Sequence, residues 1–368
     1  MMFSEQAVKT FMACRFCPMC RHVCPIGLTT GNEGNTPRGK GLLLNYVHTG
    51  MEFTAEMAQD MYECCLCHNC ASECETGFSP PLFIREARTQ AVVQDLAPPA
   101  VRALLDNLEA TDNIFGLTAE NVSPDLREAV GTLPETAPTL LYLGATARFK
   151  TPDIALAVIR LLQKAGVEFT VLADEPSSGA EPGDLMGFVE DVRQVAQKCA
   201  AAITASGAAT LVVLDAHSAR MFKQQYAEWG IALPAAVVTA TDYVAGLLRD
   251  GRLSAKAAGV AATFQDDSAL SRELDETETP REIIAAMGID LKEMFLNRKR
   301  VKSGGTVLLM EYAPRLGQLA GEGRWLDAQR AGVPVLLTST PDSFVVMRET
   351  QPETMTTTDI FVLLEQNT

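Results

Sequence analysis

The chain has 368 residues, enough for two or three domains, and its 47% apolar and 21% charged residues exclude a disordered or fibrous protein. A formal net charge of −15 at pH 7 argues against nucleic acid as a partner, because neutralising phosphates requires clustered Lys and Arg. The longest apolar runs, residues 211–214 and 333–337, have the length of strands, so we expect no membrane span.

The ten cysteines are concentrated at one end of the chain: nine lie between Cys14 and Cys74, and only Cys199 lies outside. This crowding favours metal ligation in a reducing compartment over a disulfide framework spread through the fold. No signal-peptide pattern precedes the first cysteines. We therefore expect a cytoplasmic protein that contacts a membrane only peripherally, through a partner.

The cysteines form two runs with the same spacing, C-x₂-C-x₂-C-x₃-C, of which the first ends in Pro25 and the second has Glu75 in the equivalent place. In ferredoxins with two such runs, the first three cysteines of each run bind one cubane and the fourth cysteine binds the other cubane. We therefore predict two [4Fe–4S] clusters. Their predicted ligands are Cys14, Cys17, Cys20 and Cys74 for the first cluster, and Cys64, Cys67, Cys70 and Cys24 for the second.

Two structural zinc sites are the alternative, since eight thiolates would also satisfy two tetrahedral ions. The full tandem spacing with Pro25 favours clusters. Of the remaining candidates, we expect Cys65 to be a bystander and Cys199 a small buried hydrophobic residue. His22 and His68 are expected to hydrogen-bond near a cluster and not to ligate iron.

The charged neighbours of the two runs differ in sign. Cations near a cluster raise its reduction potential and anions lower it, which predicts a higher potential for the first cluster. The residues concerned are Arg15, Arg21, Arg38 and Lys40 beside the first run, and Glu63, Glu73 and Glu75 beside the second.

The chain before about residue 138 shows helical patterns and no strand pattern. Residues 42–47 follow the turn Thr36-Pro-Arg-Gly-Lys, residues 55–63 lead into the second cysteine run, and residues 80–94 begin with two prolines. These features predict an α-helical ferredoxin domain at residues 1–98, followed by a connector at residues 99–137.

After residue 138 the pattern changes to short uncharged strands that alternate with helices, which predicts parallel sheets covered on both faces. We expect an α + α/β protein with two pseudo-repeated α/β domains after the ferredoxin domain, at residues 138–264 and 265–368. No phosphate-binding or dinucleotide fingerprint follows any strand, so the sequence predicts no NAD, FAD or ATP site on this chain. The predicted strands are residues 140–143, 168–172, 210–215, 235–239, 306–310, 333–338 and 360–364.

The two cysteine runs, the turn at Thr36 and the α/β halves together resemble the family of the D-type heterodisulfide reductase subunits and the glycolate oxidase iron–sulfur subunit, which includes lactate-utilisation iron–sulfur proteins. In that family each α/β half usually bears a cysteine-rich CCG module that can hold a further metal centre. Here the modules are degenerate, because other residues replace the expected cysteines. The replacements are Gly144-Ala145, Ser177-Ser178-Gly179, His217-Ser218, the segment from Glu311 to Gly317, and the segment from Thr338 to Asp342.

The resemblance implies an electron-transfer subunit of a multisubunit oxidoreductase, with no catalytic residues of its own. It implies a flavoprotein partner that carries FAD, such as a 2-hydroxy-acid dehydrogenase, and a downstream electron carrier or quinone-linked subunit. Three alternatives stay open: an electron-bifurcating or electron-transfer-flavoprotein-linked acyl-CoA complex, a protein whose clusters are only structural, and a heterodisulfide-reductase-like enzyme. The last would need a redesigned α/β site around Ser177, His217 and Arg315.

Overall fold

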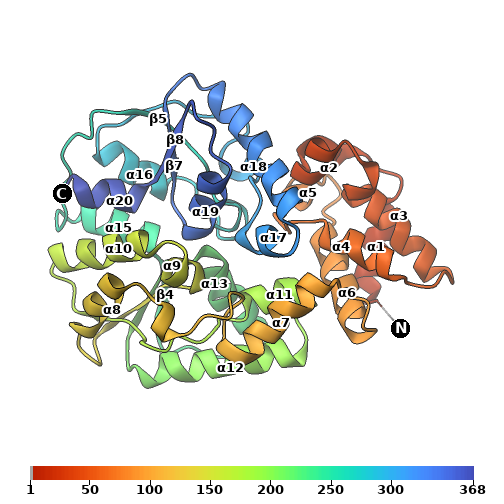
Figure 1. Cartoon of the computed structure of the whole chain (residues 1–368), viewed down its shortest axis with the longest axis horizontal. Coiled ribbons are helices and arrows are strands. Elements are labelled where there is room, and N and C mark those ends of the chain that lie inside the picture. Colours follow the sequence, from red (N-terminus) through yellow and green to blue (C-terminus); the bar gives the residue numbers. More distant parts are fainter. Residues whose placement is uncertain (1–2) are drawn as a thin grey trace.

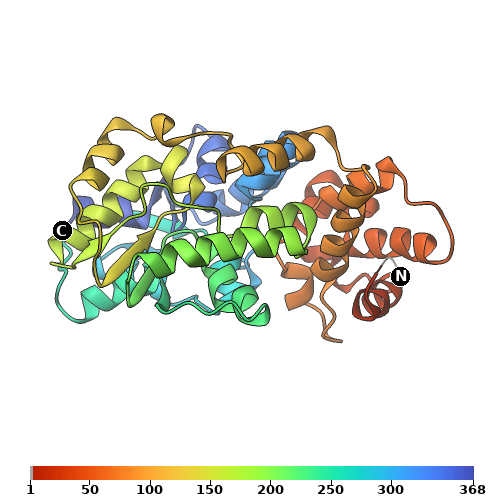
Figure 2. The same ribbon diagram turned by 90° about the horizontal axis from the view of Figure 1, so that it is seen from below.

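An all-helical unit at the N-terminal end lies beside a larger body that contains two parallel sheets (Figure 1). The computed structural model describes residues 3–368. Seen from below, the helical unit and the C-terminus lie at opposite ends of the molecule (Figure 2). The helical unit contains α1 (Glu5–Cys14), η1 (Met19–Val23), α2 (Pro25–Thr30), η2 (Glu33–Asn35), α3 (Pro37–His48), α4 (Ala55–Tyr62), α5 (Asn69–Ser72) and α6 (Pro80–Val93).

Local capping explains where these helices begin. The Thr36 hydroxyl accepts a hydrogen bond from Gly39 N at 3.2 Å, and Pro37 occupies the first turn of α3, which needs no amide donor there. Helices α1, α3 and α6 pack together around Phe11 and Phe83, whose rings meet edge to face at 6.3 Å. The predicted helices at residues 42–47, 55–63 and 80–94 correspond to α3, α4 and α6.

The segment between the helical unit and the sheets is itself helical. It contains α7 (Pro99–Thr111), η3 (Ala119–Asn121) and α8 (Pro124–Gly131).

Two four-stranded sheets follow, and all their strand pairs are parallel. Their strand orders are β2-β1-β3-β4 and β6-β5-β7-β8, so each sheet starts with its second strand at one edge. The first half contains β1 (Thr139–Tyr142), α9 (Ala145–Phe149), α10 (Pro152–Lys164), β2 (Phe169–Thr170), α11 (Ala180–Met186), α12 (Glu190–Ala205), β3 (Thr210–Val213), α13 (Ala216–Arg220), η4 (Met221–Gln225), α14 (Tyr226–Glu228), β4 (Ala236–Thr239) and α15 (Ala240–Arg249).

The second half contains β5 (Ala261–Phe264), η5 (Ala269–Glu273), α16 (Thr279–Ala286), β6 (Asp290–Leu291), η6 (Arg298–Arg300), α17 (Val307–Tyr312), α18 (Pro314–Gln329), β7 (Val335–Thr338), α19 (Pro341–Glu349), β8 (Thr356–Asp359) and α20 (Ile360–Gln366).

Two predicted strands are wrong. Residues 306–310 lie in helix α17, which begins where the Thr306 hydroxyl accepts a hydrogen bond from Leu309 N at 3.1 Å. Residues 360–364 lie in α20, because the Asp359 carboxylate caps the helix at Phe361 N, 2.9 Å away. Short apolar runs fit a buried helix as well as a strand, and the caps decide between them.

The strands predicted from the sequence also omit β5 and β6. Strand β5 pairs with β6 and β7 in the second sheet, so the first strand of that sheet lies just before residue 265. The domain limits at residues 98, 137 and 264 stay predictions.

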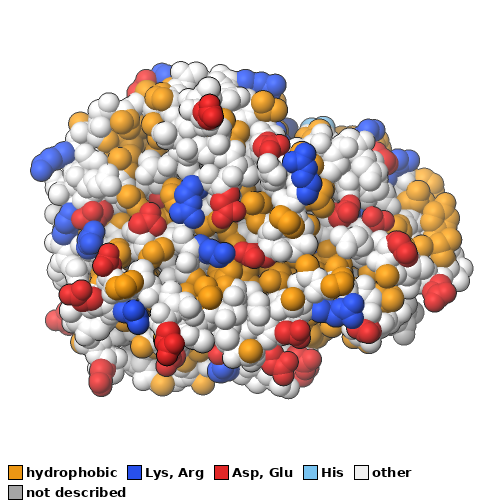
Figure 3. All heavy atoms as spheres, in the orientation of Figure 1, with side chains coloured by type: hydrophobic (Ala, Val, Ile, Leu, Met, Phe, Trp, Pro, Cys, Tyr) orange, Lys and Arg blue, Asp and Glu red, His pale blue; other side chains and the backbone are white. Residues whose placement is uncertain are grey.

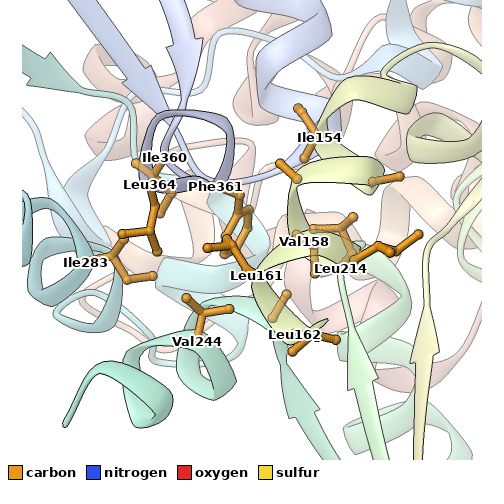
Figure 4. Close-up of a cluster of buried hydrophobic side chains, with 14 of the residues drawn as sticks. Ile154, Val158, Leu161, Leu162, Leu214, Val244, Ile283, Ile360, Phe361 and Leu364 are labelled. Carbon is orange, nitrogen blue, oxygen red and sulfur yellow. The ribbon is translucent and has the colours of Figure 1, made fainter. Parts of the chain in front are cut away.

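The two α/β halves share one apolar core. Figure 4 shows Val158 and Leu161 of α10 facing Phe361 of α20, with Ile283 of α16 and Val244 of α15 nearby. All five side chains are essentially inaccessible to solvent. The helical unit is fixed to both halves, because α6 packs on α11 of the first and α2 packs on α18 of the second.

Candidate functional site

The first predicted ligand set lies near the surface of the helical unit. Cys14 ends α1, Cys20 lies in η1, and Cys74 follows α5, while Cys17 between them is exposed. Burial, together with the nearby thiols of Cys20, Cys74 and Cys17, raises the pKa of Cys14 to about 12. The structure therefore brings these four cysteines together.

The second set lies deeper. Cys24, Cys64, Cys67 and Cys70 line one pocket, together with the predicted bystander Cys65. Burial raises the pKa of Cys24 to about 12, and the neighbouring thiols of Cys64 and Cys67 contribute in the same direction. In both places the fourth cysteine of one run lies with three cysteines of the other, which is the crossed arrangement that the spacing predicts.

The chemistry of this donor set fits two cubanes. All ten cysteines are free thiols, and thiolates are the ligands that iron–sulfur clusters use. Crowding and burial disfavour thiolates unless a cation compensates them, and coordinated iron supplies that charge. Within residues 3–368, no three His, Cys, Asp or Glu side chains form a group that would hold a single metal ion.

Backbone amides already point at three of the sulfurs. Gly27 N donates to Cys24 Sγ at 3.4 Å, Leu66 N to Cys64 Sγ at 3.4 Å, and Phe78 N to Cys74 Sγ at 3.3 Å. Hydrogen bonds to cluster sulfurs are one means of setting the reduction potential.

The loop of the second run is held in an unusual conformation. Leu66 and His68 have φ values of 48° and 59°, a left-handed backbone that costs free energy in a residue other than glycine. Arg272 Nη1 donates to Cys67 O at 2.6 Å, and Arg88 Nη2 donates to Cys64 O at 2.6 Å. These long-range bonds hold the loop, and no local sequence pattern signals them.

Arg88 also joins the helical unit to the α/β body. Its fully enclosed guanidinium donates to Met61 O at 3.1 Å, Asp184 O at 2.7 Å and the Tyr312 hydroxyl at 3.2 Å. The ring of Tyr62 lies 4.9 Å from its centre, a cation–π distance.

The charges around the two sites differ from the sequence-based expectation. Lys40 was assigned to the first run, and this is wrong: its buried ammonium lines the pocket of the second set and donates to Asp60 O. Glu73 forms an ion pair with Arg300 at 3.1 Å, which offsets its charge beside the second run. Buried Lys40 and Arg88 therefore lie at the second site, whereas Arg15 and Arg21 beside the first run are half-buried and exposed, respectively.

The other candidates near the cysteines have defined contacts. Cys65 is buried in the same pocket as Cys67, and its role as a bystander stays a prediction. His22 Nδ1 lies 2.7 Å from Met19 O, and His68 Nε2 lies 3.5 Å from Glu273. Cys199 is buried in α12, as predicted.

Two serines lie at α/β positions where the resemblance implies cysteines. The hydroxyls of Ser178 and Ser218 are 2.7 Å apart and buried. His217 lines two small pockets between the halves, and both also contain Asp342. Arg315 is exposed on α18 and contacts Gln318, so the structure does not bring it to His217.

Known proteins resemble this chain in its cysteine region and along most of its length. A family model described as "4Fe-4S dicluster domain" matches residues 11–78. A probable membrane-anchored ferredoxin of Chromohalobacter salexigens is 27% identical over 82% of this chain, which spans 51% of that relative. The D-type subunit of dihydromethanophenazine:CoB–CoM heterodisulfide reductase from Methanosarcina acetivorans is 26% identical over 89% of this chain and 86% of its own length. A crystal structure of a hypothetical protein from Helicobacter pylori has the same fold, with a TM-score of 0.60, 11% identity, and coverage of 90% of this chain and 68% of that one.

The dicluster-domain match and the iron–sulfur relatives support an electron-transfer role for this chain. They also support its resemblance to the family that includes the D-type heterodisulfide reductase subunits and the glycolate oxidase iron–sulfur subunit. Among residues 3–368, no helix has the length and apolar character needed to cross a membrane.

Proposed function

We propose that this chain relays single electrons through two [4Fe–4S] clusters between a flavoprotein partner and a downstream carrier. Cys14, Cys17, Cys20 and Cys74 hold the first cluster; Cys24, Cys64, Cys67 and Cys70 hold the second. One observation carries the proposal: the eight cysteines lie in these two sets of four. A dicluster ferredoxin with this tandem spacing needs the same two sets.

The clusters supply reversible one-electron chemistry, and the chain's own residues hold and tune them. The amides at Gly27, Leu66 and Phe78 stabilise added negative charge on the sulfurs. The first site faces solvent, so it is the end at which a protein partner docks. The exposed side chains of Phe16 and Met19, which alternate with its cysteines, support this role. Figure 3 shows hydrophobic side chains gathered at the outer edge of the helical unit.

The α/β halves act as a rigid support in this proposal and descend from a repeated unit. The identical strand order of the two sheets supports the pseudo-repeat. The replacement of module cysteines by Ser178 and Ser218 removes the soft ligands that a third metal centre would need.

Anaerobic affinity purification from the native host tests the proposal. A stoichiometric FAD-containing subunit and about eight irons per chain, the content of two cubanes, are expected. A 2-hydroxy-acid dehydrogenase and an electron-transfer flavoprotein would point to different substrates for the complex. Zinc in place of iron, or clusters that no physiological potential reduces, would contradict the relay.

A further inference from the structure

A cleft of about 610 Å³ opens between α6 of the helical unit and the segment from α11 to α14 of the first α/β half. Its volume is within the range of small-molecule sites, roughly 300–1,000 Å³. His68, the residue after Cys67, lines it, whereas none of the eight predicted ligands does. The cleft is therefore next to the second cysteine site and separate from it.

Two arginines form the charged wall of this cleft. Arg85 and Arg220 both stack on the ring of Phe188, at 5.0 and 5.8 Å from its centroid. Arg85 is firmly paired, because its Nη2 and Nε donate to Asp184 Oδ1 at 2.9 and 3.2 Å. Arg220 is held loosely, since its ion pairs with Asp184 and Glu273 are both 3.5 Å long.

Three nitrogens of Arg220 and His68 form no hydrogen bond. Arg220 Nε and Nη2 lack one although the side chain is only 5% exposed, and His68 Nε2 lacks one as well. The nearest acids, Asp184 to Nη2 and Glu273 to His68 Nε2, are both 3.5 Å away and outside hydrogen-bond geometry. Nε and one Nη form one edge of a guanidinium, the two-donor fork that matches the two oxygens of a carboxylate. A buried fork that donates no hydrogen bond costs free energy that a carboxylate ligand would recover.

The backbone on both sides of the cleft is also unusual. The π-helical turn η4 starts directly after Arg220, and the π-helical turn η5 ends at Glu273. Isolated π-turns are rare and occur frequently at functional sites. These are the two π-turns within residues 3–368, and each places a charged side chain at this cleft.

We infer that this cleft binds a monocarboxylate. Its two oxygens lie on the Nε–Nη2 edge of Arg220, and its carbon chain lies against the apolar side chains of Leu82, Phe188 and Met221, which also line the cleft. Asp184 and Glu273 already balance the two arginines, and Glu86 and Glu228, which also line the cleft, add negative charge, so multiply charged anions are disfavoured. The carboxylate comes either from a free organic acid or from the chain end of a partner protein.

Calorimetry on the anaerobically purified full chain with its iron tests this inference. Butyrate is expected to bind, while butyramide and inorganic phosphate bind at least about tenfold more weakly, since only butyrate presents a singly charged two-oxygen acceptor. Arg220→Lys keeps the charge but loses the fork, so butyrate affinity falls by about tenfold or more. Arg193→Lys is the matched control, because Arg193 Nε also lacks a hydrogen-bond partner but Arg193 does not line the cleft. This variant should bind butyrate as tightly as the wild-type chain.

Two further arms identify the source and guard against a folding defect. Binding of butyrate indicates a free acid, and binding only of a short peptide with a free C-terminus, and not of its amidated form, indicates a partner's chain end; both support the inference. If Arg220→Lys loses iron, Leu82→Trp fills the cleft without altering the guanidinium and should abolish binding. No carboxylate binding to the wild-type chain, equal binding of butyramide, or unchanged affinity in Leu82→Trp would overturn the inference. Calorimetry measures no electron transfer, so these outcomes are independent of the proposed relay.

Discussion

The two cysteine sites have the same spacing in sequence and opposite surroundings in the fold. Cys17 is exposed, and Phe16 beside it is 74% exposed. The second site is enclosed by the buried side chains of Lys40 and Arg88 and by contacts from the α/β body. One motif therefore serves as a surface contact in one copy and as a buried junction in the other, and residues distant in sequence make the difference.

Replacing a cluster ligand should show the difference between the two sites most clearly. Cys67→Ser and Cys17→Ser should each lower the iron content by about four per chain, because each removes one cubane. Only Cys67→Ser should also loosen the junction between the helical unit and the body. Iron analysis and limited proteolysis of both variants check this, and equal proteolytic sensitivity would contradict the junction role of the second site.

Replacing Arg88 should have the next largest effect, on the stability of the fold. Arg88→Met leaves the carbonyls of Met61 and Asp184 without the donor that Arg88 supplies and leaves Cys64 O with the Tyr312 hydroxyl alone, so the free energy of unfolding should fall by about 3 kcal/mol or more. The control Arg15→Met removes one hydrogen bond to Asn45 at the first site and should cost about 1 kcal/mol. Anaerobic denaturant titration compares the two, and similar losses would refute the difference.

Removing a nearby positive charge should lower the reduction potential of the second cluster more than that of the first. Lys40 is buried, so its charge is poorly screened, and Lys40→Gln should lower the midpoint of the second cluster by about 60 mV, a tenfold change in a one-electron equilibrium. Arg15→Gln should lower the first midpoint by less. EPR-monitored redox titration measures both midpoint potentials. A larger midpoint shift in Arg15→Gln than in Lys40→Gln would contradict the conclusion that cations influence the second cluster more strongly.

The stability contributed by the pockets that His217 and Asp342 line should respond to pH. Burial raises the pKa of Asp342 to about 7, and Asp342, Asp215 and Asp267 outweigh burial and raise that of His217 to about 9. Both pKa values lie above those of the unfolded chain, so this stability is present at low pH and is lost as pH rises toward 9. We expect the free energy of unfolding to fall by about 1–2 kcal/mol between pH 5.5 and 9. If the free energy of unfolding falls less with pH in Asp342→Asn than in the wild-type chain, the His217–Asp342 pair is the source of the effect. A free energy of unfolding that rises with pH would contradict this.

The helical unit and its dicluster domain can be predicted from the sequence, because helical patterns and the spacing of cysteines within a run are local properties. Prediction fails where the decision is not local. The apolar segment at residues 306–310 is a helix because of the cap at Thr306, and Lys40 lies at the second site because α3 buries it there. Arg272, which holds Cys67, lies 205 residues away in sequence, and no local pattern identifies such a contact.

The most direct test of the two crossed clusters is the EPR spectrum and iron content of reduced Cys24→Ser. Cys24 belongs to the first run in sequence but lies among the cysteines of the second set. If the sets are crossed, about four irons remain, one cubane's content, with the signal that also remains in Cys67→Ser. A remaining signal that matches Cys17→Ser would place Cys24 with its own run and contradict the crossed arrangement.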